Sequence, residues 1–128
     1  MDRSNILKGF NNHLSEFFDD IIRVFPDDFE IKKAHTSLTN LKKINPKIII
    51  EVWKNYISDN YSDQIENGNI EYFLNKNYVS DLQDSDYNKE ILDKIERMKN
   101  SIRLMSDDNK EKTIKYLQNL NKLCKLYH

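Results

Sequence analysis

The chain has 128 residues, with 20 Lys and Arg against 21 Asp and Glu, so its formal net charge is −1. This near balance gives no global attraction to nucleic acid or to an anionic membrane. One cysteine excludes an intramolecular disulfide, and no apolar run approaches the roughly 20 residues of a membrane span. Two glycines and two prolines leave little material for β-hairpins. We therefore expect a single all-α domain over residues 1–128, without a secretory leader or a membrane span, in the cytoplasm or a virion.

Apolar side chains recur at helical spacing through the first 25 residues. The stripe comprises Ile6, Phe10, Leu14, Phe17 and Ile21. It predicts a helix from Ser4, which Phe25-Pro26 ends because the residue before a proline avoids the α conformation. The next residues, Asp27 to Glu30, have the spacing of a capping box and predict a second helix that runs to about Lys43.

The densest apolar stripe follows in the middle of the chain. Asn45 can cap the first free amides of a helix, and Pro46 suits its first position, so a third helix begins here. Its apolar residues are Ile48, Ile49, Val52, Trp53, Tyr56 and Ile57. A stripe this wide meets neighbours on two sides, which places the third helix at the centre of a bundle.

The periodicity fails over an irregular segment near residues 61–86. We expect a turn here in which Gly68 takes a positive φ, followed by a short helix that Asn69 caps. The polar stretch after Asn75 predicts a long loop. Its candidate anchors are Tyr78, Val79 and Leu82.

Two regular stripes then predict two helices separated by a short break. The first, from about Tyr87, carries Ile91, Ile95, Met98, Ile102 and Met105. The break and the N-cap oxygens for the second come from Ser106-Asp107-Asp108-Asn109. Its stripe comprises Thr113, Leu117, Leu120, Cys124 and Tyr127. The short break predicts a C-terminal helical hairpin, and the whole pattern predicts a single-domain bundle of five or six helices.

No segment carries a recognisable catalytic or metal-binding motif. Alignment of Gly68 with the glycine of an EF-hand loop puts Ile65 and Leu74 where two calcium ligands are required. The histidines, His13, His35 and His128, are too widely spaced for a metal motif. His13 and His35 are expected at the borders of the apolar stripes of their helices. Cys124 lies on an apolar face and is expected to be a small buried hydrophobe. We therefore expect no enzyme activity and no catalytic residue, metal or cofactor.

The lysines of the second helix and its following turn form a local basic run. Between Ile31 and Ile50 the chain has five lysines and no acidic residue, and we call these lysines the basic ridge: Lys32, Lys33, Lys42, Lys43 and Lys47. Such a run meets phosphates or an acidic partner, or it forms a solvated face that pairs with carboxylates of the same chain.

Aromatic residues gather where the periodicity fails: Tyr61, Tyr72, Phe73 and Tyr78. Exposed aromatics among polar residues are typical of interfaces, so residues 61–82 are a candidate surface for a protein partner or for self-association. The alternative is that this segment closes one end of the bundle with the aromatics as ordinary core.

Three stretches together resemble small uncharacterised proteins encoded by nucleocytoplasmic large DNA viruses of algae and amoebae. They are Phe10-Asn11-Asn12 through Phe25-Pro26-Asp27-Asp28, Asn45-Pro46 through Trp53 and Tyr56, and Tyr116-Leu117-Gln118-Asn119-Leu120. The resemblance implies a viral origin but no activity and no functional residue. We therefore expect a non-enzymatic interaction or structural protein of a virion or an infected cell, and as the alternative a nucleic-acid-associated accessory protein that uses the basic ridge.

Overall fold

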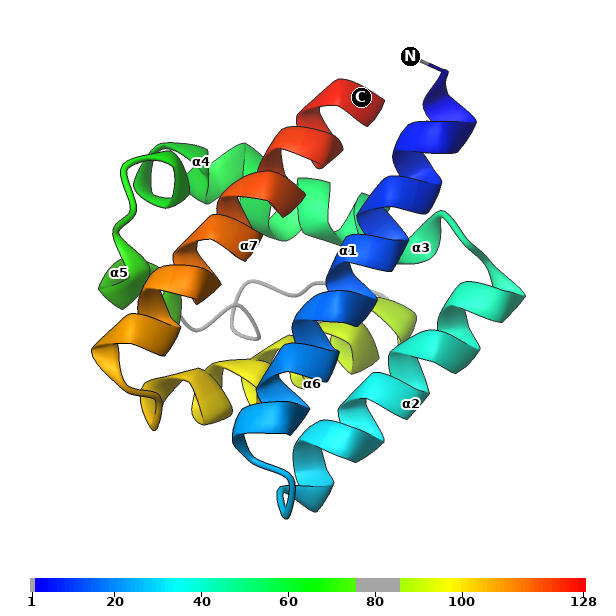
Figure 1. Ribbon diagram of the computed structural model, residues 1–128. Coiled ribbons are helices and arrows are strands. Elements are labelled where there is room, and N and C mark those ends of the chain that lie inside the picture. Colours follow the sequence, from blue (N-terminus) through cyan, green and yellow to red (C-terminus); the bar gives the residue numbers. More distant parts are fainter. Residues whose placement is uncertain (1, 76–85) are drawn as a thin grey trace.

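The computed structural model describes residues 2–75 and 86–128, and within these ranges it contains helices and turns but no strand. The helices are α1 (Arg3–Val24), α2 (Phe29–Ile44), α3 (Ile48–Trp53), the π-helical turn η1 (Lys54–Ser58), α4 (Asp59–Glu66), α5 (Ile70–Asn75), α6 (Asp86–Arg103) and α7 (Asp107–Tyr127). Figure 1 shows α7, α1 and α2 side by side, with the α3–α4 segment and α6 crossing behind them. The all-α prediction is confirmed.

Side-chain caps begin the helices close to the expected positions. Ser106 Oγ accepts a hydrogen bond from the Asn109 amide at 3.3 Å. Asn45 Oδ1 accepts one from the Lys47 amide at 3.1 Å, but this bond lies in the turn before α3, whose N-cap is Lys47 without a side-chain bond, so Asn45 is not the cap of this helix. The cap of α2 is Asp28 rather than Asp27, and its Oδ1 lies 3.2 Å from the Ile31 amide. These bonds satisfy amides that have no partner within their own helix.

The segment after Trp53 differs from its prediction. The sequence predicts a turn that begins near residue 62. In the structure the helical segment instead continues through η1 and α4 to Glu66. This segment departs from regular α geometry at two places, the π-helical turn at Lys54–Ser58 and a kink at Tyr61, whose φ of −130° and ψ of 18° are not helical. The turn comes later, at Gly68, which has the expected positive φ of 75°. Residues 76–85 of the predicted loop lie outside the described residues.

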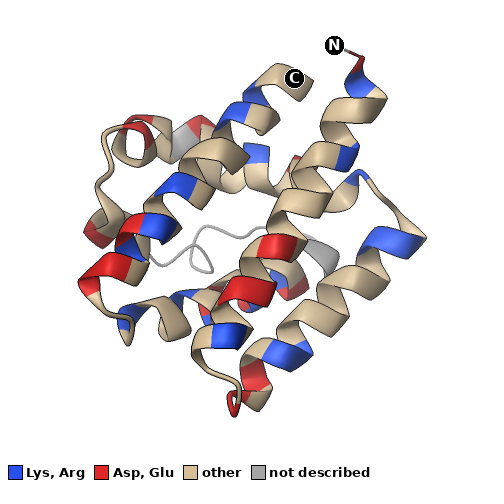
Figure 2. Ribbon diagram, viewed as in Figure 1, with Lys and Arg blue, Asp and Glu red and all other residues tan. Residues whose placement is uncertain are grey.

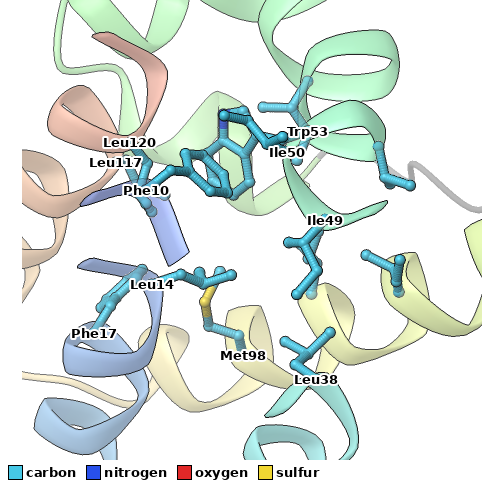
Figure 3. Close-up of a cluster of buried hydrophobic side chains, with 14 of the residues drawn as sticks. Phe10, Leu14, Phe17, Leu38, Ile49, Ile50, Trp53, Met98, Leu117 and Leu120 are labelled. Carbon is cyan, nitrogen blue, oxygen red and sulfur yellow. The ribbon is translucent and has the colours of Figure 1, made fainter. Parts of the chain in front are cut away.

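The core is centred on α3, as its apolar stripe predicts. Trp53 has no exposed surface, and its ring meets that of Phe10 edge to face with the centroids 5.9 Å apart. Figure 3 shows Leu117 and Leu120 of α7 beside Phe10. Helices α1, α3 and α7 therefore share one apolar cluster.

The two C-terminal helices are joined by a short turn, as expected of a hairpin, but they diverge from it. Helix α6 packs on α2, where Ser101 Oγ donates a hydrogen bond to Asp28 Oδ2 at 2.9 Å. Helix α7 packs along α1, where the Tyr116 ring stacks on Phe17 with the centroids 4.9 Å apart. Each helix thus finds its main neighbour in the N-terminal half of the chain.

His13 lies within the contact between α1 and α7. Its ring is 4.8 Å from the Tyr116 ring, and its Nδ1 is 3.9 Å from a Glu16 oxygen. Burial lowers the pKa of His13 below its ordinary value, and the Glu16 carboxylate opposes this effect without cancelling it. The folded protein therefore favours the neutral imidazole.

Trp53→Ala should lower the free energy of unfolding by about 3–5 kcal/mol, because it leaves a large cavity at the centre of the core. Urea unfolding followed by circular dichroism measures this loss, since the variant has no tryptophan fluorescence. The matched variant Trp53→Phe retains a ring and should lose clearly less. Equal stability of Trp53→Ala and the wild type would contradict the central position of α3.

His13→Gln should make stability less sensitive to acid. Because the pKa of His13 is lower in the folded protein than in the unfolded chain, its contribution is present above the unfolded pKa of about 6.5 and is lost as the pH falls towards the folded value. Urea unfolding at a series of pH values from about 7.5 to 5 measures this difference. Identical slopes for the variant and the wild type would show that His13 has no such role.

Candidate interaction surface on helix α2

Helix α2 has one buried face and one exposed face along its whole length. The buried residues are Ile31, Ala34, Leu38 and Leu41, which pack into the core. The exposed residues at spacings of three and four define what we call the outer face of α2: Phe29, Lys32, Lys33, Thr36, Asn40, Lys43 and Ile44. They fall within an arc of about 120° and span roughly 22 Å along the helix axis. No acidic residue lies among them, because Glu30, which is also exposed on α2, falls outside this arc and lies near Arg97 of α6.

The lysines of the basic ridge have no carboxylate partner within the described residues. The ion pairs of this part of the chain, at N–O distances up to 4.0 Å, include none of the five. Nearby carboxylates have other partners: Glu30 lies 3.8 Å from Arg97, and Asp19 lies 3.6 Å from His35. Figure 2 shows Lys near both ends of α2 and in the turn after it. Among the described residues, the five lysines therefore form no ion pair at this distance.

Large apolar side chains stand at the two ends of the same face. Phe29 is 71% exposed and Ile44 is 74% exposed. The Lys32 ammonium lies over the Phe29 ring, 5.6 Å from its centroid, which is within cation–π range. The charge run alone did not reveal these two residues, although their spacing from Lys33 and Lys43 on a helix could have done so. The outer face therefore combines cations with exposed apolar groups.

The aromatic cluster is divided between core and surface. Tyr61 and Phe73 are buried, whereas Tyr72 is 39% exposed and its ring lies 5.6 Å from that of Tyr61. Tyr78 lies outside the described residues. A buried Phe73 cannot touch a partner, so the structure favours the core alternative for Tyr61 and Phe73 and leaves Tyr72 as the exposed aromatic of this group.

Other side chains considered in the sequence are bound within the fold. The Cys124 thiol is buried and donates to the Ile50 carbonyl at 3.7 Å, and burial raises its pKa to about 12, which disfavours the nucleophilic thiolate. His35 Nε2 lies 2.9 Å from Ser15 Oγ between α2 and α1. Within residues 2–75 and 86–128, no His, Cys, Asp and Glu side chains gather into a group of three or more that could hold a metal. Asp63 of the expected turn lies within α4.

No helix in the described part of the chain combines the length and the hydrophobicity that crossing a bilayer requires. No family model, curated protein or solved structure matches the chain significantly. Arguments about its function therefore start from the geometry of its surface.

Phe73→Ala should lower the free energy of unfolding by about 3–5 kcal/mol, because it opens a cavity in the core. Tyr72→Ala, at the neighbouring residue, is the matched variant. It should lower the free energy of unfolding by about 1 kcal/mol or less, because the Tyr72 ring is partly exposed. Thermal and urea unfolding of the two single variants measures the difference. Similar losses for both would contradict the division of this cluster into core and surface.

Proposed function

We propose that the protein is a non-enzymatic interaction protein that binds an acidic segment of a protein partner through the outer face of α2. The observation that carries this proposal is the combination of unpaired lysines and exposed apolar side chains on one helix face. Binding would place partner carboxylates opposite Lys32, Lys33 and Lys43. Opposite charges across an interface speed association and exclude partners of the wrong sign.

The exposed apolar groups favour a protein partner over nucleic acid. Contacts with a phosphate backbone use cations and hydrogen-bond donors, which the basic ridge supplies. The apolar side chains of Phe29 and Ile44 make no such contact. Full burial of each of these side chains against a protein contributes about 1.5–3 kcal/mol. The resemblance to proteins of large DNA viruses leads us to propose that the partner belongs to a virion or an infected cell.

Charge reversal on the outer face should abolish this binding. The test variant combines Lys32→Glu, Lys33→Glu and Lys43→Glu, and the matched control combines Lys8→Glu, Lys115→Glu and Lys122→Glu, which are exposed lysines elsewhere that lack a carboxylate within 4.0 Å in the described residues. Both variants change the net charge by the same amount. Quantitative mass spectrometry compares the proteins that each immobilised variant captures from the nuclease-treated native source.

The expected result is a protein that the wild type and the control retain and that the outer-face variant loses by about tenfold or more. Phe29→Ala with Ile44→Ala should reduce the same capture without a change in charge. Equal capture by all variants would contradict the proposal. The nucleic-acid alternative is tested by measuring the binding of DNA and RNA to the purified chain at several salt concentrations. Salt-dependent binding that the outer-face variant loses, together with no protein captured from the nuclease-treated source, would favour nucleic acid over a protein as the partner.

A further inference from the structure

A groove of about 240 Å³ lies between the C-terminal half of α1 and the first turns of α7. Phe17 and Ile21 line it but are buried, so its accessible apolar wall comes from Val24 on one side and from the half-buried Met105 on the other. Val24 is partly exposed although it is apolar, so the wall is open to solvent. The volume is below the roughly 300 Å³ at which pockets for whole cofactors or drug-sized ligands begin, and it suits one large side chain.

The charged groups that line the groove differ in whether they have a partner of opposite charge. The Asp20 carboxylate accepts hydrogen bonds from the Tyr116 hydroxyl and from the Arg23 guanidinium, so its charge is compensated within the protein. The hydrogen bond to Asp20 is the largest cause that raises the pKa of Tyr116 to about 12, while Arg23 acts in the opposite direction, so the phenol remains a donor. Lys112 has no carboxylate within 4.0 Å among the described residues. The groove therefore has two cations and one carboxylate, and one cation is unpaired.

We propose that this groove binds one large apolar side chain of an acidic peptide segment in a protein partner, with a carboxylate beside that side chain paired to Lys112. The apolar wall would cover the side chain, and the unpaired cation would select a neighbouring Asp or Glu over a Lys or Arg. A nucleic acid suits the groove poorly, because its phosphates would approach Asp20 and its backbone has no apolar group to fill the wall. This site does not depend on the outer face of α2, and either surface can fail its test alone.

The test uses a short synthetic peptide, acetyl-Asp-Glu-Trp-Glu-Asp-amide, titrated into the ¹⁵N-labelled full chain and followed by changes in backbone amide shifts. A matched peptide carries alanine in place of tryptophan. The protein variants are Lys112→Glu and, as the control, Lys8→Glu, an exposed lysine about 22 Å along α1 from Arg23. Both variants make the same change in charge, and their spectra report directly whether each is folded.

The expected result is saturable shifts at the amides of Val24, Met105, Thr113 and their neighbours. Lys112→Glu should weaken binding about threefold or more, Lys8→Glu should leave it unchanged, and the alanine peptide should not saturate. Three outcomes would overturn the proposal: no saturable shift up to about 10 mM peptide, equal binding to the Lys112→Glu variant, or shifts confined to the outer face of α2. The last outcome would still support the proposed function, so the two ideas are distinguishable.

Discussion

The contact between Phe10 and Trp53 is the constraint on which the rest of the structure depends. It fixes α3 against α1 at the centre of the core, and Asn11 supports it from the adjacent position by donating from Nδ2 to the Pro46 carbonyl at 2.9 Å. Helix α2, which the turn at Pro46 joins to α3, buries its apolar stripe on α1 and α6. Its opposite side is then left in solvent. The exposure of the basic ridge is thus a consequence of how the core is packed.

Much of the fold is predictable from local signals, and the exceptions have specific physical causes. The cap that precedes α7 and the positive φ of Gly68 depend on neighbours in sequence, so they could be located without a structure. The helix through Ile65 was missed because the polar residues before Gly68 favour a turn, although Ile57, Tyr61 and Ile65 keep a spacing of four and all three are buried. The packing of α6 on α2 and of α7 on α1 depends on residues far apart in sequence, which periodicity does not specify.

The positive charge of the candidate site was predictable from the sequence, but the pairing and the burial of its lysines were not. A run of lysines without acidic residues is visible in the sequence, yet whether carboxylates from other helices pair with them depends on the fold. Charge alone can also mislead: Lys99 is fully buried, with its ammonium 2.7 Å from Glu96, at a position that continues the spacing from Ile95 to Ile102. Burial lowers the pKa of Lys99, and Glu96 opposes that effect. Of the ridge lysines, Lys32, Lys33 and Lys43 are exposed on the outer face of α2, whereas Lys42 is half-buried and lines a hollow with Phe18 of α1, and Lys47 is exposed in the turn after α2.

The most direct test of the central claim, that α2 presents its outer face to an acidic protein, is site-specific photo-crosslinking in the native source. A photoreactive amino acid replaces Thr36, in the middle of the outer face, and in a second variant it replaces Asn119, which is exposed on α7. The account predicts that position 36 forms an adduct with one protein, through a segment rich in Asp and Glu, and that position 119 does not. The same adducts from both positions, or adducts at position 36 with nucleic acid alone, would contradict it.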